Sequence, residues 1–184
     1  MDWIEEVKEK ISRKNQILFA KDSEYLQELT QLIEKQNRRA VVLWAFEFAE
    51  DAVQKLSERY PNENRPSLSL THSKEWAAGR IKMPEAKQAI LGVHAFAKEI
   101  ESPEDIALCH AVGQACGTVH TKRHAPGFPI YELTALVRHY GIDDCKEPVE
   151  KRMAQYIDRI LYWEENEPEY DGLWAGFMLK ENSK

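Results

Sequence analysis

The sequence has no long apolar run and no cysteine pair, and each absence excludes a class of protein. The longest uncharged apolar run covers residues 40–46, whereas a helix that spans a bilayer needs about 20 such residues. We therefore expect no membrane partner. The amino terminus, MDWIEEVKEK, carries charges where a signal peptide needs an apolar core. Three cysteines without a CxxC motif are typical of free thiols in a reducing compartment, which predicts a cytoplasmic protein.

Basic charge is also scarce, because 25 Lys and Arg residues face 31 Asp and Glu residues for a net charge of −6. A protein that binds phosphates needs a basic stripe, and none is visible, so we expect no nucleic-acid partner. The acidic excess lies in residues 143–171, which hold ten acidic residues against four basic ones. A segment of this sign matches a protein partner with a basic surface.

Motifs that bind cofactors or support catalysis are missing. The chain has no GxGxxG, no Walker loop, no GxSxG and no HExxH, so dinucleotide, nucleotide, serine-hydrolase and zinc-protease functions have no support. The sequence therefore predicts no cofactor and no catalytic residue, and it favours a binding protein over an enzyme.

The chain does contain repeated helical periodicity, which predicts an all-α fold. The helix predicted for residues 103–120 is apolar over a wide arc and is expected at the centre of a bundle. Ser102 is placed to cap it and Pro103 fits its first turn. Gly113 and Gly117 lie inside it, where glycine costs roughly 1 kcal/mol relative to alanine, so a neighbouring helix is expected to approach closely.

We expect about seven helices in a single domain of residues 1–184. Its parts are two N-terminal helices in 1–37, a core in 38–140, and an acidic C-terminal helix with a docked tail in 141–184. Besides the helix at 103–120, we predict helices at 2–11, 38–60, 67–79, 84–100 and 147–166. A further helix follows a cap at residue 22 or 23 and ends at residue 33, and another runs from residue 130 to 140 or 141.

Several short motifs occur in a fixed order: RP at 65–66, EWAAGRIKM at 75–83, VHAFAKE at 93–99 and CHAVGQACGTVHTKRHA at 109–125. Together with a later tyrosine, they resemble a putative immunity protein family of bacterial polymorphic toxin systems, which is all-helical and Ala-rich. The resemblance covers roughly residues 38–140 and implies a protein that binds and neutralises a cognate toxin. The matching residues are Trp76, Gly79, His94, Gly113, Gln114, Ala115, His120, His124 and Tyr131.

One set of side chains forms a candidate polar cluster: His94, His110, Gln114, His120, His124 and Tyr131. These residues could line a pocket, or they could form a hydrogen-bond network that fixes the register of the helices. The alternative function is therefore a helical protein or enzyme that binds a small molecule or a metal. Cys116, His120 and His124 have the spacing of ligands on one helix face, but Lys122 and Arg123 beside them oppose a cation. We predict no bound metal.

Two further groups have an ordinary and a functional interpretation. Cys116 and His120 have the spacing of a thiol and a base. Glu47, Glu50 and Asp51 could do acid–base chemistry, although a solvated helix face is the commoner meaning of such a group.

The acidic segment also contains the candidate partner-binding residues Trp163, Tyr170 and Trp174. Aromatic side chains dominate the hot spots of protein interfaces. These three could therefore anchor a basic toxin, or they could seal the last helix onto the core.

Overall fold

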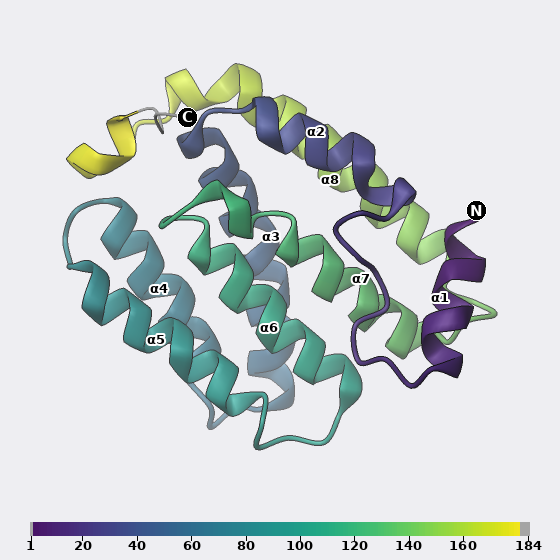
Figure 1. Ribbon diagram of the computed structural model, residues 1–184. Coiled ribbons are helices and arrows are strands. Elements are labelled where there is room, and N and C mark those ends of the chain that lie inside the picture. Colours follow the sequence, from purple (N-terminus) through teal and green to yellow (C-terminus); the bar gives the residue numbers. More distant parts are fainter. Residues whose placement is uncertain (1, 181–184) are drawn as a thin grey trace.

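In the computed structural model, which describes residues 2–180, the helix predicted for residues 103–120 lies at the centre of the molecule (Figure 1). This helix, α6 (Pro103–Gly117), packs against α3, α4, α5 and α7. Its cap is the one predicted, because the Ser102 hydroxyl accepts a hydrogen bond from the Asp105 backbone N–H at 3.2 Å. Residue 1 and residues 181–184 of the predicted domain lie outside the described residues.

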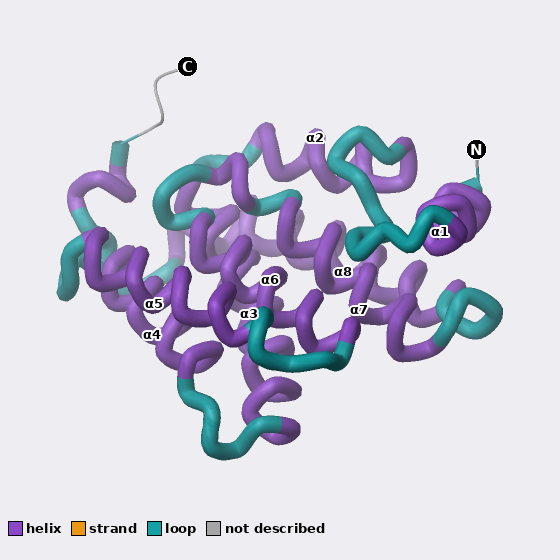
Figure 2. Tube along the Cα trace, turned by 60° about the horizontal axis from the view of Figure 1, so that its bottom comes forward, coloured by secondary structure: helices purple, strands orange, loops and turns teal. Residues whose placement is uncertain are grey.

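The described residues form one compact all-α bundle without strands (Figure 2), which confirms the predicted fold class. It has eight α-helices, which correspond to the eight predicted segments although the expected count was about seven, and four short 3₁₀ helices. No helix among residues 2–180 has the length and apolar character needed to cross a bilayer. Besides α6, the elements are α1 (Trp3–Ser12), η1 (Glu24–Leu26), α2 (Gln27–Lys35), α3 (Arg38–Arg59), α4 (Arg65–Ala77), α5 (Met83–Phe96), η2 (Lys122–His124), α7 (Gly127–Tyr140), α8 (Lys146–Asn166), η3 (Glu167–Glu169) and η4 (Gly176–Leu179).

Several helix ends differ from their predicted positions, and the largest difference is at the end of α5, which stops at Phe96 instead of residue 100. The central helix ends at Gly117, and the chain tightens into i→i+3 hydrogen bonds up to His120. α4 and α7 begin earlier than predicted, at Arg65 and Gly127. Pro66 and Pro129 therefore lie in first turns, where the missing N–H removes no helical hydrogen bond.

α3 is buried on several sides, as expected for a helix with aromatic residues around its circumference. Residues 40–46 are all buried. α8 covers α3 and also packs against α2 and α7 (Figure 1). The Trp44 indole N–H donates to the Tyr156 carbonyl oxygen at 3.0 Å, and the two rings meet edge to face. This contact fixes the position of α8 along α3.

A buried ion pair joins α7 to α8. Arg152 Nε and Nη2 lie 2.9 and 2.8 Å from the two carboxylate oxygens of Glu132, whose side chain is only 1% exposed. The Tyr156 hydroxyl donates to the same carboxylate. The guanidinium of Arg152 also stacks over Phe48 of α3, 4.6 Å from the ring centroid. One cation therefore connects three helices.

The C-terminal tail docks on the bundle, as its apolar residues predict. The Ala175 backbone N–H donates to the Ala77 carbonyl at 2.8 Å, and Met178 is fully buried. Gly79 has a φ of +78°, and a Cβ at this position would lie 3.3 Å from Ala175. Glycine therefore allows both the turn after α4 and the close approach of the tail.

Arginines at the start of α3 hold the two ends of this tail segment. Arg39 Nε lies 2.6 Å from a Glu167 carboxylate oxygen, and Arg39 Nη1 donates to the Met178 carbonyl at 3.2 Å. Arg38 donates to the Phe177 carbonyl at 3.3 Å and stacks over the Phe177 ring. The tail is thus tied to the helix that begins the predicted core.

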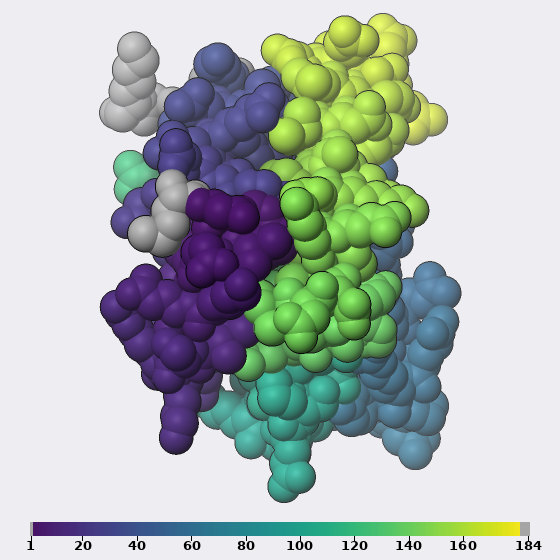
Figure 3. Space-filling view, turned by 90° about the vertical axis from the view of Figure 1, so that its right-hand side faces the viewer, coloured from purple at the N-terminus to yellow at the C-terminus, as the bar shows by residue number. Residues whose placement is uncertain are grey.

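At the other end of the molecule, the N-terminal residues lie against the C-terminal third of the chain, as the space-filling view shows (Figure 3). The Leu18 backbone N–H donates to the Thr134 hydroxyl of α7 at 3.0 Å, and Arg138 donates to the Asn15 carbonyl at 2.8 Å. Leu18 is fully buried. The N-terminal segment is therefore part of the same core.

We predict that Arg152→Met lowers the free energy of unfolding by about 3–5 kcal/mol, because it leaves the Glu132 carboxylate buried without its cation. Urea unfolding followed by circular dichroism measures the change. Arg13→Met is the matched control, since it breaks an exposed pair with Glu9 and should cost no more than about 1 kcal/mol. Equal losses in the two variants would contradict the role of the buried pair.

Candidate functional site

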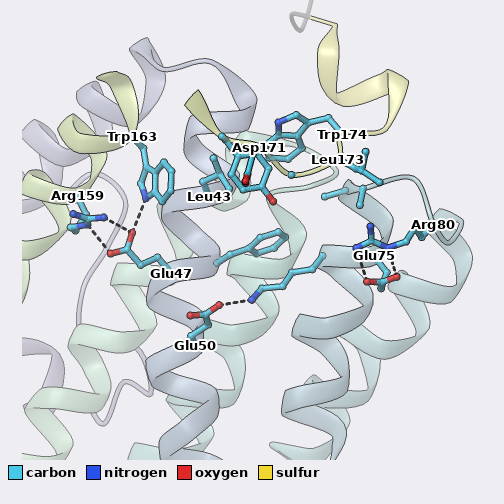
Figure 4. A pocket seen from close by; sticks show the side chains of 16 residues that line it. Leu43, Glu47, Glu50, Glu75, Arg80, Arg159, Trp163, Asp171, Leu173 and Trp174 are labelled. Atoms are coloured by element: carbon cyan, nitrogen blue, oxygen red, sulfur yellow. Dashed lines mark hydrogen bonds and ion pairs between the residues drawn. The ribbon is translucent and has the colours of Figure 1, made fainter. Parts of the chain in front are cut away.

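A groove of about 640 Å³ lies where the C-terminal tail crosses α3, α4 and α8 (Figure 4). All three predicted partner-binding aromatics line it, together with residues of α3 and α4 that the sequence patterns did not indicate. We call it the tail groove, and its main lining residues are Leu43, Phe46, Glu47, Glu50, Lys74, Glu75, Arg80, Arg159, Trp163, Tyr170, Asp171, Leu173 and Trp174.

Trp163 is held in one orientation by the α3 carboxylate of Glu47. Its indole N–H donates to Glu47 Oε2 at 2.7 Å. Arg159 Nε lies 2.7 Å from Glu47 Oε1, and its guanidinium stacks over Tyr162 at 3.8 Å from the ring centroid. Figure 4 shows this network at one end of the groove. The wall of the groove on this side is therefore preorganised.

Glu47, Glu50 and Asp51 do not form a simple solvated face. Each carboxylate pairs with a cation from another helix, although Glu50 and Asp51 are also exposed to solvent. Their partners are Lys74 of α4 for Glu50, and Arg152 and Arg159 of α8 for Asp51 and Glu47. The group therefore links helices.

The opposite side of the groove is formed by the tail. The rings of Tyr170 and Trp174 lie 5.0 Å apart between centroids. Trp163 and Trp174 pack partly against the core, whereas Tyr170 is 38% and Leu173 is 65% exposed. Trp163 and Trp174 therefore pack against the core, while Tyr170 and Leu173 leave apolar surface exposed to solvent.

Unpaired acidic residues lie at the end of α8, in η3 and in the tail that forms one side of this groove. Asp171 lines the groove, and Glu164, Glu165 and Glu169 precede it on the surface. Within residues 2–180, none of these four carboxylates has an ion-pair partner, although Lys74, Arg80 and Arg159 are paired inside the groove. The uncompensated charge of the site is therefore negative.

A second hollow, of about 320 Å³, lies between α5, α6 and η2, and we call it the imidazole cleft. His94, Gln114, His120 and His124 of the predicted polar cluster line it. Its other lining residues are Trp76, Met83, Lys87, Ile90, Leu91, Gly113 and Gly117.

The predicted polar cluster is divided between two hollows. His110 and Tyr131 line a separate one, of about 380 Å³, on the side of the N-terminal segment. The connection between them is a hydrogen bond of 2.7 Å between the Nδ1 atoms of His94 and His110. The His110 ring then packs against the Tyr131 ring at 5.2 Å between centroids.

Two glycines of α6 form the floor of the imidazole cleft. A Cβ at position 113 would lie 2.2 Å from His94 Nε2, and one at position 117 would lie 3.0 Å from His124 Cγ. The sequence predicts a close neighbour at each of these glycines, and in each case that neighbour is an imidazole ring. Gln114 Oε1 accepts a hydrogen bond of 3.2 Å from His124 Nδ1, which leaves His124 Nε2 without a proton.

Burial lowers the pKa of His94 to about 4, and the nearby imidazoles of His110 and His124 and the ammonium of Lys98 act in the same direction. Burial also lowers the pKa of His110 and of His124. These three imidazoles are therefore neutral at pH 7. No carboxylate lines the cleft among the described residues.

The spacing of Cys116 with His120 and His124 does not place the three side chains on one helix face, because α6 ends at Gly117. Cys116 is fully buried and accepts a hydrogen bond of 3.4 Å from the Ser69 hydroxyl. Burial raises the pKa of its thiol, which suits a small core residue better than a nucleophile. Within residues 2–180, no group of three or more His, Cys, Asp or Glu side chains is arranged to hold a metal.

The fold defines a helical-bundle protein, and comparison with protein families assigns it more closely. Residues 31–159 match the family described as Imm-5 like putative immunity protein. The chain therefore belongs to this family, and the match extends beyond residues 38–140 at both ends. Comparisons with curated proteins and with solved structures found no match. The tail groove combines α3 and α4 of the matched region with Trp163 and a tail that follow it.

We predict that the protein loses stability as the pH falls from about 6.5 towards 5. The pKa of His94 is lower in the folded state than its ordinary value of 6.5, so the unfolded chain binds more protons in this range and folding is opposed. Urea unfolding at several pH values measures the slope for the wild type and for His94→Gln. The variant should show a weaker decline, and parallel curves would contradict the assignment.

Proposed function

We propose that the chain is a cytoplasmic immunity protein that binds and neutralises a cognate bacterial toxin through the tail groove. Membership of the Imm-5-like putative immunity protein family is the observation that carries this proposal. Neutralisation by occupation of a toxin surface needs no catalytic group in the immunity protein. The proposed function therefore requires a surface that suits a protein partner.

The tail groove has the composition of an interface centre. Protein interfaces take most of their binding energy from a few aromatic and arginine side chains in well-packed positions. Trp163 is fixed by Glu47 and Trp174 packs against Tyr170. Because these rings are already ordered, a partner that contacts them loses little conformational entropy in the immunity protein.

The charge around the groove indicates a basic partner. The four unpaired carboxylates, of which Asp171 lines the groove, are exposed to solvent, and residues 143–171 contain the whole acidic excess of the chain. Complementary charge mainly accelerates the encounter of two proteins, while the aromatic anchors determine how slowly they separate. We therefore assign the two features to different steps of toxin binding.

The direct test of the function is co-expression with the cognate toxin domain, sought first in the gene next to that of this chain. Cells that make the toxin should survive when the wild-type chain is present, and the two purified proteins should form a stable complex in size-exclusion chromatography. Growth arrest despite folded, abundant immunity protein would contradict the proposal.

For the tail groove we predict that Trp174→Ala raises the dissociation rate of the toxin about 30-fold, which corresponds to roughly 2 kcal/mol for a hot-spot aromatic. Surface plasmon resonance measures the rate. Tyr140→Ala is the matched control, because Tyr140 is an exposed aromatic of α7 outside the groove. Circular dichroism must show that both variants are folded.

The association rate should respond to salt instead. Raising the salt from about 0.05 to 0.5 M shortens the Debye length and should slow association by on the order of tenfold. A toxin that associates at the same rate in both buffers would argue against a basic partner. An unchanged dissociation rate in Trp174→Ala would place the toxin on another surface.

A further inference from the structure

The imidazole cleft has features of a ligand site that toxin neutralisation does not require. Its volume of about 320 Å³ lies at the lower end of the range for small-molecule pockets. Met83 and Leu91 at its edge are 44% and 57% exposed, so the cleft is open to solvent. Apolar walls with a few convergent polar groups are the usual composition of such pockets.

The shape of the cleft suits a flat ligand. The rings of Trp76 and His120 lie nearly parallel, with 22° between their planes and 6.5 Å between their centroids. The floor is flat because the rings of His94 and His124 lie directly against Gly113 and Gly117. Ile90 and Leu91 of α5 provide the apolar side. A planar aromatic ring can contact all of these surfaces at once.

The polar groups of the cleft favour an anionic end on this ligand. Lys87 is the only charged residue among the described lining residues, and no carboxylate accompanies it. The Gln114 amide and the imidazole of His94 add hydrogen-bonding groups beside the glycine floor. In a chain with a net charge of −6, a hollow without any carboxylate is electrostatically distinct from its surroundings.

We propose that the imidazole cleft binds a small planar aromatic acid, with its ring between Trp76, Ile90 and Leu91 and its carboxylate directed to Lys87. The imidazoles of His94 and His124 are neutral and already hydrogen-bonded to His110 and Gln114, so the carboxylate pairs with the Lys87 ammonium and not with them. This site is independent of the proposed toxin contact, because no described residue lines both the cleft and the tail groove.

Three planar probes of similar shape and different charge test the proposal: benzoate, benzamide and benzamidinium. Each is titrated into the ¹⁵N-labelled full chain, and amide resonances are followed by NMR. Benzoate should cause saturable shifts concentrated in residues 83–94 and 113–124, with an affinity at least tenfold higher than that of benzamidinium. Equal affinities for the three probes, or shifts that do not saturate or lie elsewhere, would overturn the proposal.

A pair of charge-reversal variants locates the site. Lys87→Glu should weaken benzoate binding at least tenfold and leave benzamide binding unchanged. Lys98→Glu makes the same charge change at an exposed position just after α5, outside the cleft lining, and should change benzoate affinity less than threefold. Equal effects of the two variants would overturn the assignment of Lys87. Because no toxin takes part, a failure here leaves the proposed function untouched.

Discussion

The position of α8 depends on the buried ion pair between Glu132 and Arg152. A carboxylate with 1% exposure is costly to bury, and this cost is offset only because Arg152 and the Tyr156 hydroxyl both bond to it. α8 contributes Trp163 and Arg159 to the tail groove and leads into the tail itself. The geometry of the candidate interface therefore depends on this ion pair in the interior of the bundle.

A second set of contacts determines where the tail goes after α8 ends. Glu167 meets Arg39 at the start of α3, and Ala175 pairs with the backbone at the end of α4. Trp76 links the tail to the imidazole cleft, since its ring packs against both Phe177 of the tail and His120 of the cleft. Trp76 lines the cleft but not the tail groove, and the two hollows have no described lining residue in common.

Much of the fold could be predicted from the sequence, because helical periodicity and capping are local properties. The all-α class, the Ser102 cap and the central position of residues 103–117 all follow from residues close together in the chain. The start of α7 lies at Gly127 and not at residue 130, because Pro129 is tolerated in the first turn of a helix. Glu132 was also missed, because the partner that permits its burial lies 20 residues away.

The candidate sites were only partly predictable for the same reason. Residue type and the neighbouring acidic charge made Trp163, Tyr170 and Trp174 candidates, but they could not show that Glu47 of α3 would orient Trp163. The sequence also grouped His110 with His94 in one polar cluster, and a hydrogen bond joins the two side chains. The two side chains nevertheless open into different hollows, because α6 separates the cleft from the N-terminal segment. Contacts between residues that lie far apart in the sequence can be identified only in the folded structure.

The central claim is that a toxin covers the tail groove. Hydrogen exchange of the backbone amides, measured with and without the cognate toxin domain, tests it most directly. The proposed function predicts new protection in residues 163–175 and in the adjoining parts of α3 and α4, with no change around residues 120–124. Protection confined to α5 and η2, with unchanged exchange in the tail, would contradict it.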